Sequence, residues 1–445
     1  MAALALPKRI YSLVLLLLIV AIAIFSLSDD AWNAVPRPPP GWRMPFTTDT
    51  GILANWWGST GRPLRIAVLE AVGTHDEVTA ALVHAFGGHD NAELVLYLKN
   101  QRYNMDAIIN GFRLHSPIVA VESSDIFLDR MQAGPRPDIL VSTTCEIDAD
   151  RKPNAFRYLL AQGTTHLFCV VHHADRWGKG RHVHVAREFL DKDMIDFIGL
   201  SQHTVDFFVN TTVPKWENPP TSVRMHAFPP VFPVDVPDLD PDAGPSLAMQ
   251  GDYSAGRRDY ENIFRQLSNV IDRTRELSAT THDNDTVSLR LLGHGKHPQV
   301  PETVRDRVFF DEGLSYPDFY ALLAQSFSVV PAFASDTYLD RKASSTVPAS
   351  LIAGAPLVAS EELLAAYSYL PREAAWVAEP GEGEMDVIER VIGEKDEFWK
   401  KRKHVREARE NIMKENRVHV REWMESALAL HPHDDEDVEE NAEEQ

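Results

Sequence analysis

Residues 344–359 read SSTVPASLIAGAPLVA, and this stretch decides the fold. Hydroxyl residues open it and can cap a helix, Pro348 suits the first turn, and Gly354 can close the helix. Pro356 prevents the helix from continuing, and the apolar residues 357–359 then predict a buried strand. The stretch is therefore expected to fold as a loop, a short helix and a strand.

The start of this helix is a candidate anion site. Backbone N–H groups at Ser344, Ser345 and Thr346 would lie beside the positive end of the helix dipole, which suits a diphosphate. A capped helix start without a ligand would give the same sequence pattern. The stretch alone therefore leaves both interpretations open.

Short apolar runs alternate with helical patterns along most of the chain. In the carboxyl half these runs are residues 246–250, 288–292, 308–310, 328–330, 357–359 and 376–378. In the amino half they are residues 64–69, 94–98, 118–121, 139–142, 167–171 and 197–200. Such alternation predicts parallel sheets covered on both faces by helices. We expect an α/β protein of two Rossmann-like doubly wound domains, residues 62–236 and 245–392, followed by a helical segment at 393–430.

Three stretches resemble the GT-B glycosyltransferases. Residues 344–359 resemble their donor-binding helix, in which a helix and a Gly-x-Pro strand entry hold a sugar nucleotide. Residues 251–258 (GDYSAGRR) are similar to the loop whose basic side chains meet the donor diphosphate. Residues 313–320 (GLSYPDFY) resemble the family's next loop and helix. The resemblance covers about 150 residues of the carboxyl half well and the amino half only by pattern.

The resemblance implies a transferase that moves a sugar from a nucleotide-sugar donor to a hydroxyl of a glycan, lipid or protein acceptor. No cofactor is expected, and a metal is not required. The implied donor-binding residues are Gly251, Arg257, Arg258, Ser344, Ser345 and Thr346. An arginine at a helix start is unfavourable with the dipole unless an anion lies nearby, so one of the two arginines is expected to meet phosphate. The other is expected to be solvated, because adjacent side chains do not share a helix face.

The sequence departs from the family at two positions. Many retaining members carry two glutamates eight positions apart, and here Arg341 and Ala349 stand in their places. A non-catalytic nucleotide- or glycan-binding protein with the same fold is therefore an alternative. Arg341 and Lys342 are either phosphate contacts or a solvated pair.

Histidines supply the candidate acid or base. His172 and His173 end the apolar run 167–171, with Asp175 close enough in sequence to orient an imidazole, and this resembles a His-containing loop of many GT-B enzymes. His75, which follows Gly73 after the first run, is the second choice. A surface or hydrogen-bonded loop histidine is the alternative for each of them.

Asp148 and Asp150 offer a rival scheme, because an Asp-x-Asp pair could hold a divalent cation in a GT-A transferase. The same spacing recurs at residues 191–193 and 238–240, so chance explains it equally well in this acidic chain. Cys145 and Cys169 have two interpretations, buried thiols or, in an oxidising lumen, a pair across neighbouring strands.

The amino terminus predicts one membrane span at residues 10–27, after Lys8 and Arg9. Residues 1–9 would be cytosolic, residues 28–61 a proline-rich stem, and the remainder lumenal, as in type II glycosyltransferases of the fungal or a similar kind. A cleaved signal peptide is the alternative. We expect a single-pass protein of the Golgi or endoplasmic reticulum membrane. Two sequons, at Asn210 and Asn284, fit a lumenal chain.

Composition excludes several other classes of protein. The 445 residues carry a formal net charge of −21, which disfavours nucleic-acid binding, and only two cysteines are present, too few for a disulfide scaffold. The acidic residues 431–445 predict a disordered tail.

Overall fold

The computed structural model describes residues 61–239, 245–277 and 287–430. The predicted membrane span, most of the stem, the second sequon and the acidic tail lie outside these residues. Within them, no helix has the length and apolar character needed to cross a bilayer.

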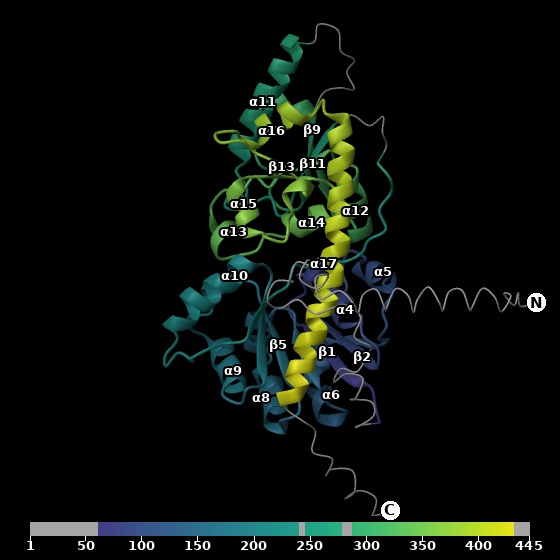
Figure 1. The fold of residues 1–445 in the computed structure, drawn as a ribbon, viewed down its shortest axis with the longest axis vertical. Coiled ribbons are helices and arrows are strands. Elements are labelled where there is room, and N and C mark those ends of the chain that lie inside the picture. Colours follow the sequence, from purple (N-terminus) through teal and green to yellow (C-terminus); the bar gives the residue numbers. More distant parts are fainter. Residues whose placement is uncertain (1–60, 240–244, 278–286, 431–445) are drawn as a thin grey trace, which may run out of the picture. The chain divides into compact units, whose positions relative to one another are not determined.

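The amino-terminal lobe is built on a parallel sheet with the strand order β3-β2-β1-β4-β5-β6-β7, of which Figure 1 labels β1, β2 and β5. Its strands are β1 (Leu64–Glu70), β2 (Ala92–Leu98), β3 (Ile118–Ser123), β4 (Ile139–Ser142), β5 (His166–Val171), β6 (Ile195–Gly199) and β7 (Met225–Ala227). Its helices are α4 (Asp76–Phe86), α5 (Met105–Asn110), α6 (Phe127–Ala133), α7 (Cys145–Arg151), α8 (Pro153–Gln162), α9 (Arg181–Leu190) and α10 (Gln202–Phe207).

The carboxyl-terminal lobe has a second parallel sheet, ordered β10-β9-β8-β11-β12-β13. Its strands are β8 (Ser246–Gln250), β9 (Ser288–Gly293), β10 (Val308–Glu312), β11 (Ser328–Val329), β12 (Leu357–Ala359) and β13 (Ala375–Val377). Its helices are α11 (Tyr260–Leu277), α12 (Tyr316–Ala324), α13 (Thr337–Asp340), α14 (Thr346–Ala353), α15 (Glu361–Ala366) and α16 (Glu384–Val391), and α17 (Lys395–Leu430) ends the described chain. In each sheet the order of the parallel strands reverses beside the first strand, between β1 and β4 and between β8 and β11. This arrangement opens a crevice at the carboxyl ends of the strands.

The expected alternation is confirmed, since each apolar run predicted as a strand forms one with small shifts at its ends. The deciding stretch forms α14 and β12, and Gly354 closes α14 with a left-handed φ of 71°. Sequence patterns missed β7, because its three residues are half-buried and include a histidine, so no apolar run marks them.

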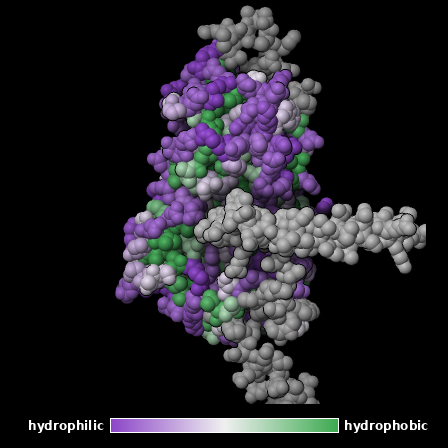
Figure 2. Space-filling model, in the orientation of Figure 1, coloured by the Kyte–Doolittle hydropathy of each residue, from purple (hydrophilic) through white to green (hydrophobic). Residues whose placement is uncertain are grey.

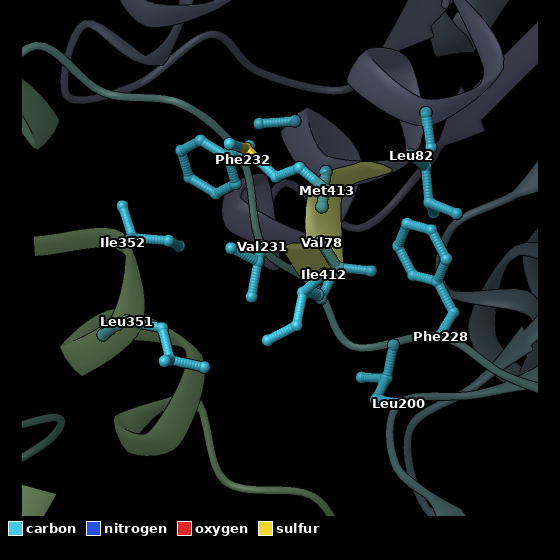
Figure 3. Packing of buried hydrophobic residues seen from close by; sticks show 14 of the residues in the cluster. Val78, Leu82, Leu200, Phe228, Val231, Phe232, Leu351, Ile352, Ile412 and Met413 are labelled. Carbon is cyan, nitrogen blue, oxygen red and sulfur yellow. The ribbon is translucent and has the colours of Figure 1, made fainter. Parts of the chain in front are cut away.

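Helix α17 belongs to neither sheet alone, since it contacts both α14 and α4. Figure 3 shows Ile412 and Met413 of α17 near side chains of both lobes, in one continuous apolar cluster. The other labelled members are Val78, Leu82, Leu200, Phe228, Val231, Phe232, Leu351 and Ile352. Polar residues dominate the face drawn in Figure 2, where apolar residues form separate patches.

Candidate functional site

A cleft of about 560 Å³ lies at the carboxyl ends of the strands beside both reversal points. Loops after β1, β2, β5 and β6 line it from one lobe, and loops after β8, β9, β10 and β11 line it from the other. The volume is in the range of small-molecule sites. Most of the residues predicted from sequence line this cleft: His75, His172, His173, Gly251, Arg257, Arg258, Ser344 and Ser345.

Arg258 lies at the base of the cleft and is only 5% exposed. Its Nη2 donates to the carbonyl of Gln250 at 2.8 Å and to Oγ1 of Thr346 at 2.8 Å. It forms no ion pair with a carboxylate of the described residues, although Glu384 attracts it at longer range, and burial lowers the pKa of its guanidinium. A buried cation without an ion-pair partner is costly, so this position favours an anionic ligand.

Two further cations line the same side of the cleft. Arg257 is exposed and donates to Asp252 at 2.7 Å, so Arg258 is the buried member of the pair and Arg257 the solvated one. Lys342 is half-buried, and burial lowers the pKa of its ammonium group. Gly251 has a φ of 119°, and a Cβ there would lie 3.2 Å from Nη2 of Arg258. A side chain at this position would therefore be strained and would crowd the guanidinium.

The start of α14 differs in detail from the prediction. Ser345 is exposed to the cleft, and Ser344 is buried at its edge with Oγ accepting the N–H of Thr346 at 3.2 Å. The side chain of Thr346 is fully buried and bonded to Gln250 and Arg258, so it does not line the cleft. Thr346 was predicted to meet the donor through its backbone N–H, but this N–H donates to Oγ of Ser344, and the hydroxyl of Thr346 accepts from Nη2 of Arg258.

His172 is held from two directions. Its Nε2 donates to the carbonyl of Thr143 at 2.7 Å, and its backbone N–H donates to Oε1 of Glu146 at 3.1 Å. The N–H of His173 reaches the same carboxylate oxygen at 3.1 Å. A neutral His172 that donates from Nε2 keeps a lone pair on Nδ1, which can accept a proton.

The other two histidines also lie in the cleft. The ring centroid of His75 lies 4.0 Å from that of His172, and burial lowers the pKa of His75 well below its ordinary value. His173 pairs its backbone with Lys342 in an isolated bridge, and burial followed by the charge of Lys342 lowers its pKa to about 3. Both rings are therefore neutral at pH 7.

The proposed role of Asp175 was wrong. Its carboxylate lies 3.6 Å from Nε of Arg341, and the group that orients His172 is the carbonyl of Thr143. Asp175 was suggested by its closeness to His172 in sequence. Thr143 contacts His172 because it follows β4, and β4 is the neighbour of β5 in the sheet.

Sequence analysis also missed two carboxylates in the first turn of α4, Asp76 and Glu77. Burial raises the pKa of Asp76 to about 6, and the hydroxyl of Tyr316 donates to its Oδ2 at 3.3 Å. Burial also raises the pKa of Glu77. Acidic residues are common at a helix start, so their type alone does not indicate a functional site. Only their position after the carboxyl end of β1 could have identified Asp76 and Glu77 as site residues.

The Asp-x-Asp metal scheme fails on geometry. Asp148 is fully buried and accepts bonds from the N–H of Ala71 at 2.9 Å and from Ser142 Oγ at 2.8 Å. Asp150 is exposed and accepts the N–H of His182 at 2.8 Å. The two carboxylates have different partners, and no group of metal ligands occurs among the described residues.

The two cysteines form a disulfide, with a Cα–Cα distance of 5.2 Å. The interpretation as buried thiols is therefore wrong, and pairing across neighbouring strand regions is correct. At the two positions that the resemblance matches to glutamates, Ala349 is buried at the wall of the cleft and Arg341 pairs with Asp340 at 2.7 Å.

Solved structures give the comparison for this arrangement. HepE of Anabaena, in complex with UDP and glucose, matches with a TM-score of 0.51 at 12% identity over 82% of this chain and 100% of that chain. Sucrose-phosphate synthase of Thermosynechococcus elongatus matches with a TM-score of 0.49 at 11% identity over 82% and 99%. A mutant O-GlcNAc transferase of Thermobaculum terrenum matches with a TM-score of 0.48 at 14% identity over 82% of this chain and 68% of that chain.

Neither protein-family models nor curated protein sequences match the chain. At 12% identity, the likeness to HepE shows a shared fold, so the chain has the GT-B arrangement of two doubly wound lobes around a cleft.

Proposed function

We propose that the chain is a glycosyltransferase that moves a sugar from a nucleotide-sugar donor to a hydroxyl acceptor. The observation that carries the proposal is Arg258, a buried guanidinium at the base of the cleft that lacks a carboxylate partner among the described residues. A nucleoside diphosphate would supply the missing negative charge in a site of low dielectric.

On the donor side, the diphosphate would lie between Arg258, Lys342 and the exposed start of α14 at Ser345. All three line the cleft. Charge-assisted hydrogen bonds there would stabilise the charge that grows on the leaving diphosphate as the bond to the sugar breaks. HepE was solved with UDP and glucose, so UDP-sugars are the first donors to test.

On the acceptor side, Nδ1 of His172 would take the proton of the attacking hydroxyl. A bond forms between that oxygen and the anomeric carbon, while the bond from this carbon to the phosphate oxygen breaks and its electron pair leaves with the nucleoside diphosphate. His75, neutral and 4.0 Å from His172 between ring centroids, is the second proton acceptor within reach. This scheme requires no metal.

One observation favours a second candidate, a non-catalytic nucleotide- or glycan-binding protein. Ala349 lines the cleft at a position where many retaining GT-B glycosyltransferases carry a glutamate. A donor bound here would therefore lack a contact with that carboxylate. Ligand binding without turnover would separate this candidate from the transferase.

We also propose the placement expected from the sequence, a single-pass type II protein with its lobes in the lumen of the Golgi or endoplasmic reticulum. The buried disulfide supports an oxidising compartment, and Asn210 of the first sequon is exposed.

The test is release of nucleoside diphosphate from a panel of nucleotide sugars, with and without mixed glycan, lipid and peptide acceptors. The proposal expects release with one donor class, unchanged by chelator and reduced by more than 100-fold in His172→Ala. No release from any donor, together with measurable nucleotide binding, would reject the transferase in favour of the binding protein.

A further inference from the structure

The Cys145–Cys169 disulfide lies beside the segments that position the histidines of the cleft. Cys169 is in β5, three residues before His172, and Cys145 is the first residue of α7. Both cysteines are buried, with exposures of 0% and 1%. The bond therefore joins the strand that carries His172 to the turn that holds its ring.

The contacts beside the disulfide connect the segments that follow β4 and β5, next to His172. The hydrogen-bonded ladder between β4 and β5 ends at the pair Ser142 and Cys169. Beyond this pair, the two segments are joined by the disulfide, by the carbonyl of Thr143 on His172 and by the carboxylate of Glu146 on two backbone N–H groups. The disulfide is the one covalent bond among these links.

The turn after β4 is also held by hydrogen bonds: the N–H of Thr143 donates to the carbonyl of Leu69 at 2.9 Å, and the N–H of Thr144 donates to Oδ2 of Asp148 at 3.2 Å. Helix α7 begins without a side-chain cap at Thr144, whose backbone is neither helical nor extended. Among the described residues, the Oγ1 of Thr144 is buried without a hydrogen-bond partner. The disulfide adds a covalent link to the hydrogen bonds at this helix start and joins α7 directly to β5.

We propose that the Cys145–Cys169 disulfide is a positioning element for His172 and His173, so that the proton-accepting side of the cleft is set only in protein folded where disulfides form. The inference rests on the proposed function for the role of His172. It adds a prediction for the same chain folded in a reducing compartment. That chain would still bind the donor in its carboxyl-terminal lobe, but His172 and His173 would not be held in their positions in the cleft.

The test uses the full chain with Cys169→Ser, compared with Leu159→Ala as a matched control. Leu159 is fully buried in the same apolar cluster but lies on α8, away from the turn after β4. Amide hydrogen exchange at residues 172 and 173 reports whether Glu146 still holds both N–H groups, and titration with UDP reports the carboxyl-terminal lobe.

The proposal expects exchange at residues 172 and 173 to rise more than tenfold in Cys169→Ser and to stay within threefold of wild type in Leu159→Ala. UDP affinity should stay within twofold in both, and where turnover is measurable kcat should fall with the donor KM unchanged. Exchange at these two residues that rises equally in both variants would overturn the proposal and leave the disulfide a general stabiliser.

Two further outcomes keep the inference separate from the proposed function. If Cys169→Ser does not fold, Cys145→Ser breaks the same bond from the helix side and is judged by the same exchange criterion. If wild type does not bind UDP, the proposed donor is wrong, while the exchange comparison still decides whether the disulfide positions the two histidines.

Discussion

Individual residues in the cleft owe their charge states to burial. His75 and His173 have lowered pKa values and are neutral at pH 7, whereas Asp76 has a raised one. Arg258 keeps its charge despite burial, because a guanidinium is not deprotonated at physiological pH. In the proposed transferase, the cleft would therefore present neutral bases to an acceptor and a fixed cation to a donor.

Asp76 gives a prediction about pH. Its pKa is about 6 in the folded protein against an ordinary value of about 4, so the folded state binds this proton more tightly than the unfolded state. The free energy of unfolding should therefore fall as pH rises from about 4 to about 6. Asp76→Asn cannot ionise at this position, so its free energy of unfolding should not fall in this way. Above pH 6 the variant should therefore be more stable than wild type, by at most about 3 kcal/mol.

Thermal unfolding at pH 4 and pH 7.5 checks this prediction. The two proteins should melt together at pH 4, where Asp76 is largely protonated. The exposed Asp129 on α6 provides the control, and Asp129→Asn should leave the pH profile of wild type unchanged. A constant difference between Asp76→Asn and wild type at both pH values would contradict the account.

Sequence reasoning found the residues that follow strand ends and missed those defined by contacts in space. His172 was predicted because the carboxyl ends of parallel strands converge. Gly251 and Arg258 were predicted from the resemblance of residues 251–258 to the GT-B donor loop. The partner of His172 was not, because Thr143 lies 29 residues away in sequence. The disulfide stayed open for the same reason, since a spacing of 24 residues does not say which strands are neighbours.

At the scale of elements, α17 links the two lobes. Its Asn416 donates to the carbonyl of Pro229 at 2.8 Å, and its Arg417 donates to Nε2 of His84 on α4 at 2.7 Å. Its helical character was expected from the sequence. Its contact with α4 was not, because an amphipathic pattern shows that a face is buried without showing which element covers it.

Met424 on α17 gives the prediction for this element. Its side chain is fully buried in the apolar cluster shared by both lobes. Met424→Ala should lower the free energy of unfolding by about 2 to 5 kcal/mol, from lost burial and the cavity left behind. Val418→Ala on the same helix, where the side chain is 49% exposed, should change it by less than about 0.5 kcal/mol.

Urea unfolding of both variants measures these differences. An equal and small effect in the two variants would show that α17 contributes no packing at Met424. That result would contradict its role as the link between the lobes.

For the whole molecule, charge is mixed at the cleft, whose lining also includes the carboxylates of Asp76, Glu77, Asp252 and Asp311. The chain carries a formal net charge of −21, yet Arg257, Arg258 and Lys342 line one side of its cleft. An overall negative protein repels anions at long range, so short-range contacts must supply donor affinity. The fold brings these cations to one cleft because the strand order reverses between β8 and β11, so that the loops after these two strands meet there.

The lumenal placement predicts a glycan on Asn210. The full chain made in a secretory eukaryotic cell should lose mobility on a gel relative to Asn210→Gln, both in an Asn284→Gln background, and a glycosidase should remove the difference. Asn210 is exposed on the short π-helix Phe208–Thr212, so the folded chain can carry the glycan. Equal mobility of the two proteins would contradict a lumenal position for this lobe.

The most direct test of the central claim is calorimetric titration of the full chain with UDP, GDP and ADP. Arg402 provides a matched control for Arg258, since it is another buried arginine that donates to backbone carbonyls but lies outside the cleft. The account predicts that one nucleotide binds, that Arg258→Gln weakens binding by at least tenfold, about 1.4 kcal/mol or more, and that Arg402→Gln changes it less than twofold. Binding that is equally tight in Arg258→Gln, or no binding of any of the three nucleotides, would contradict it.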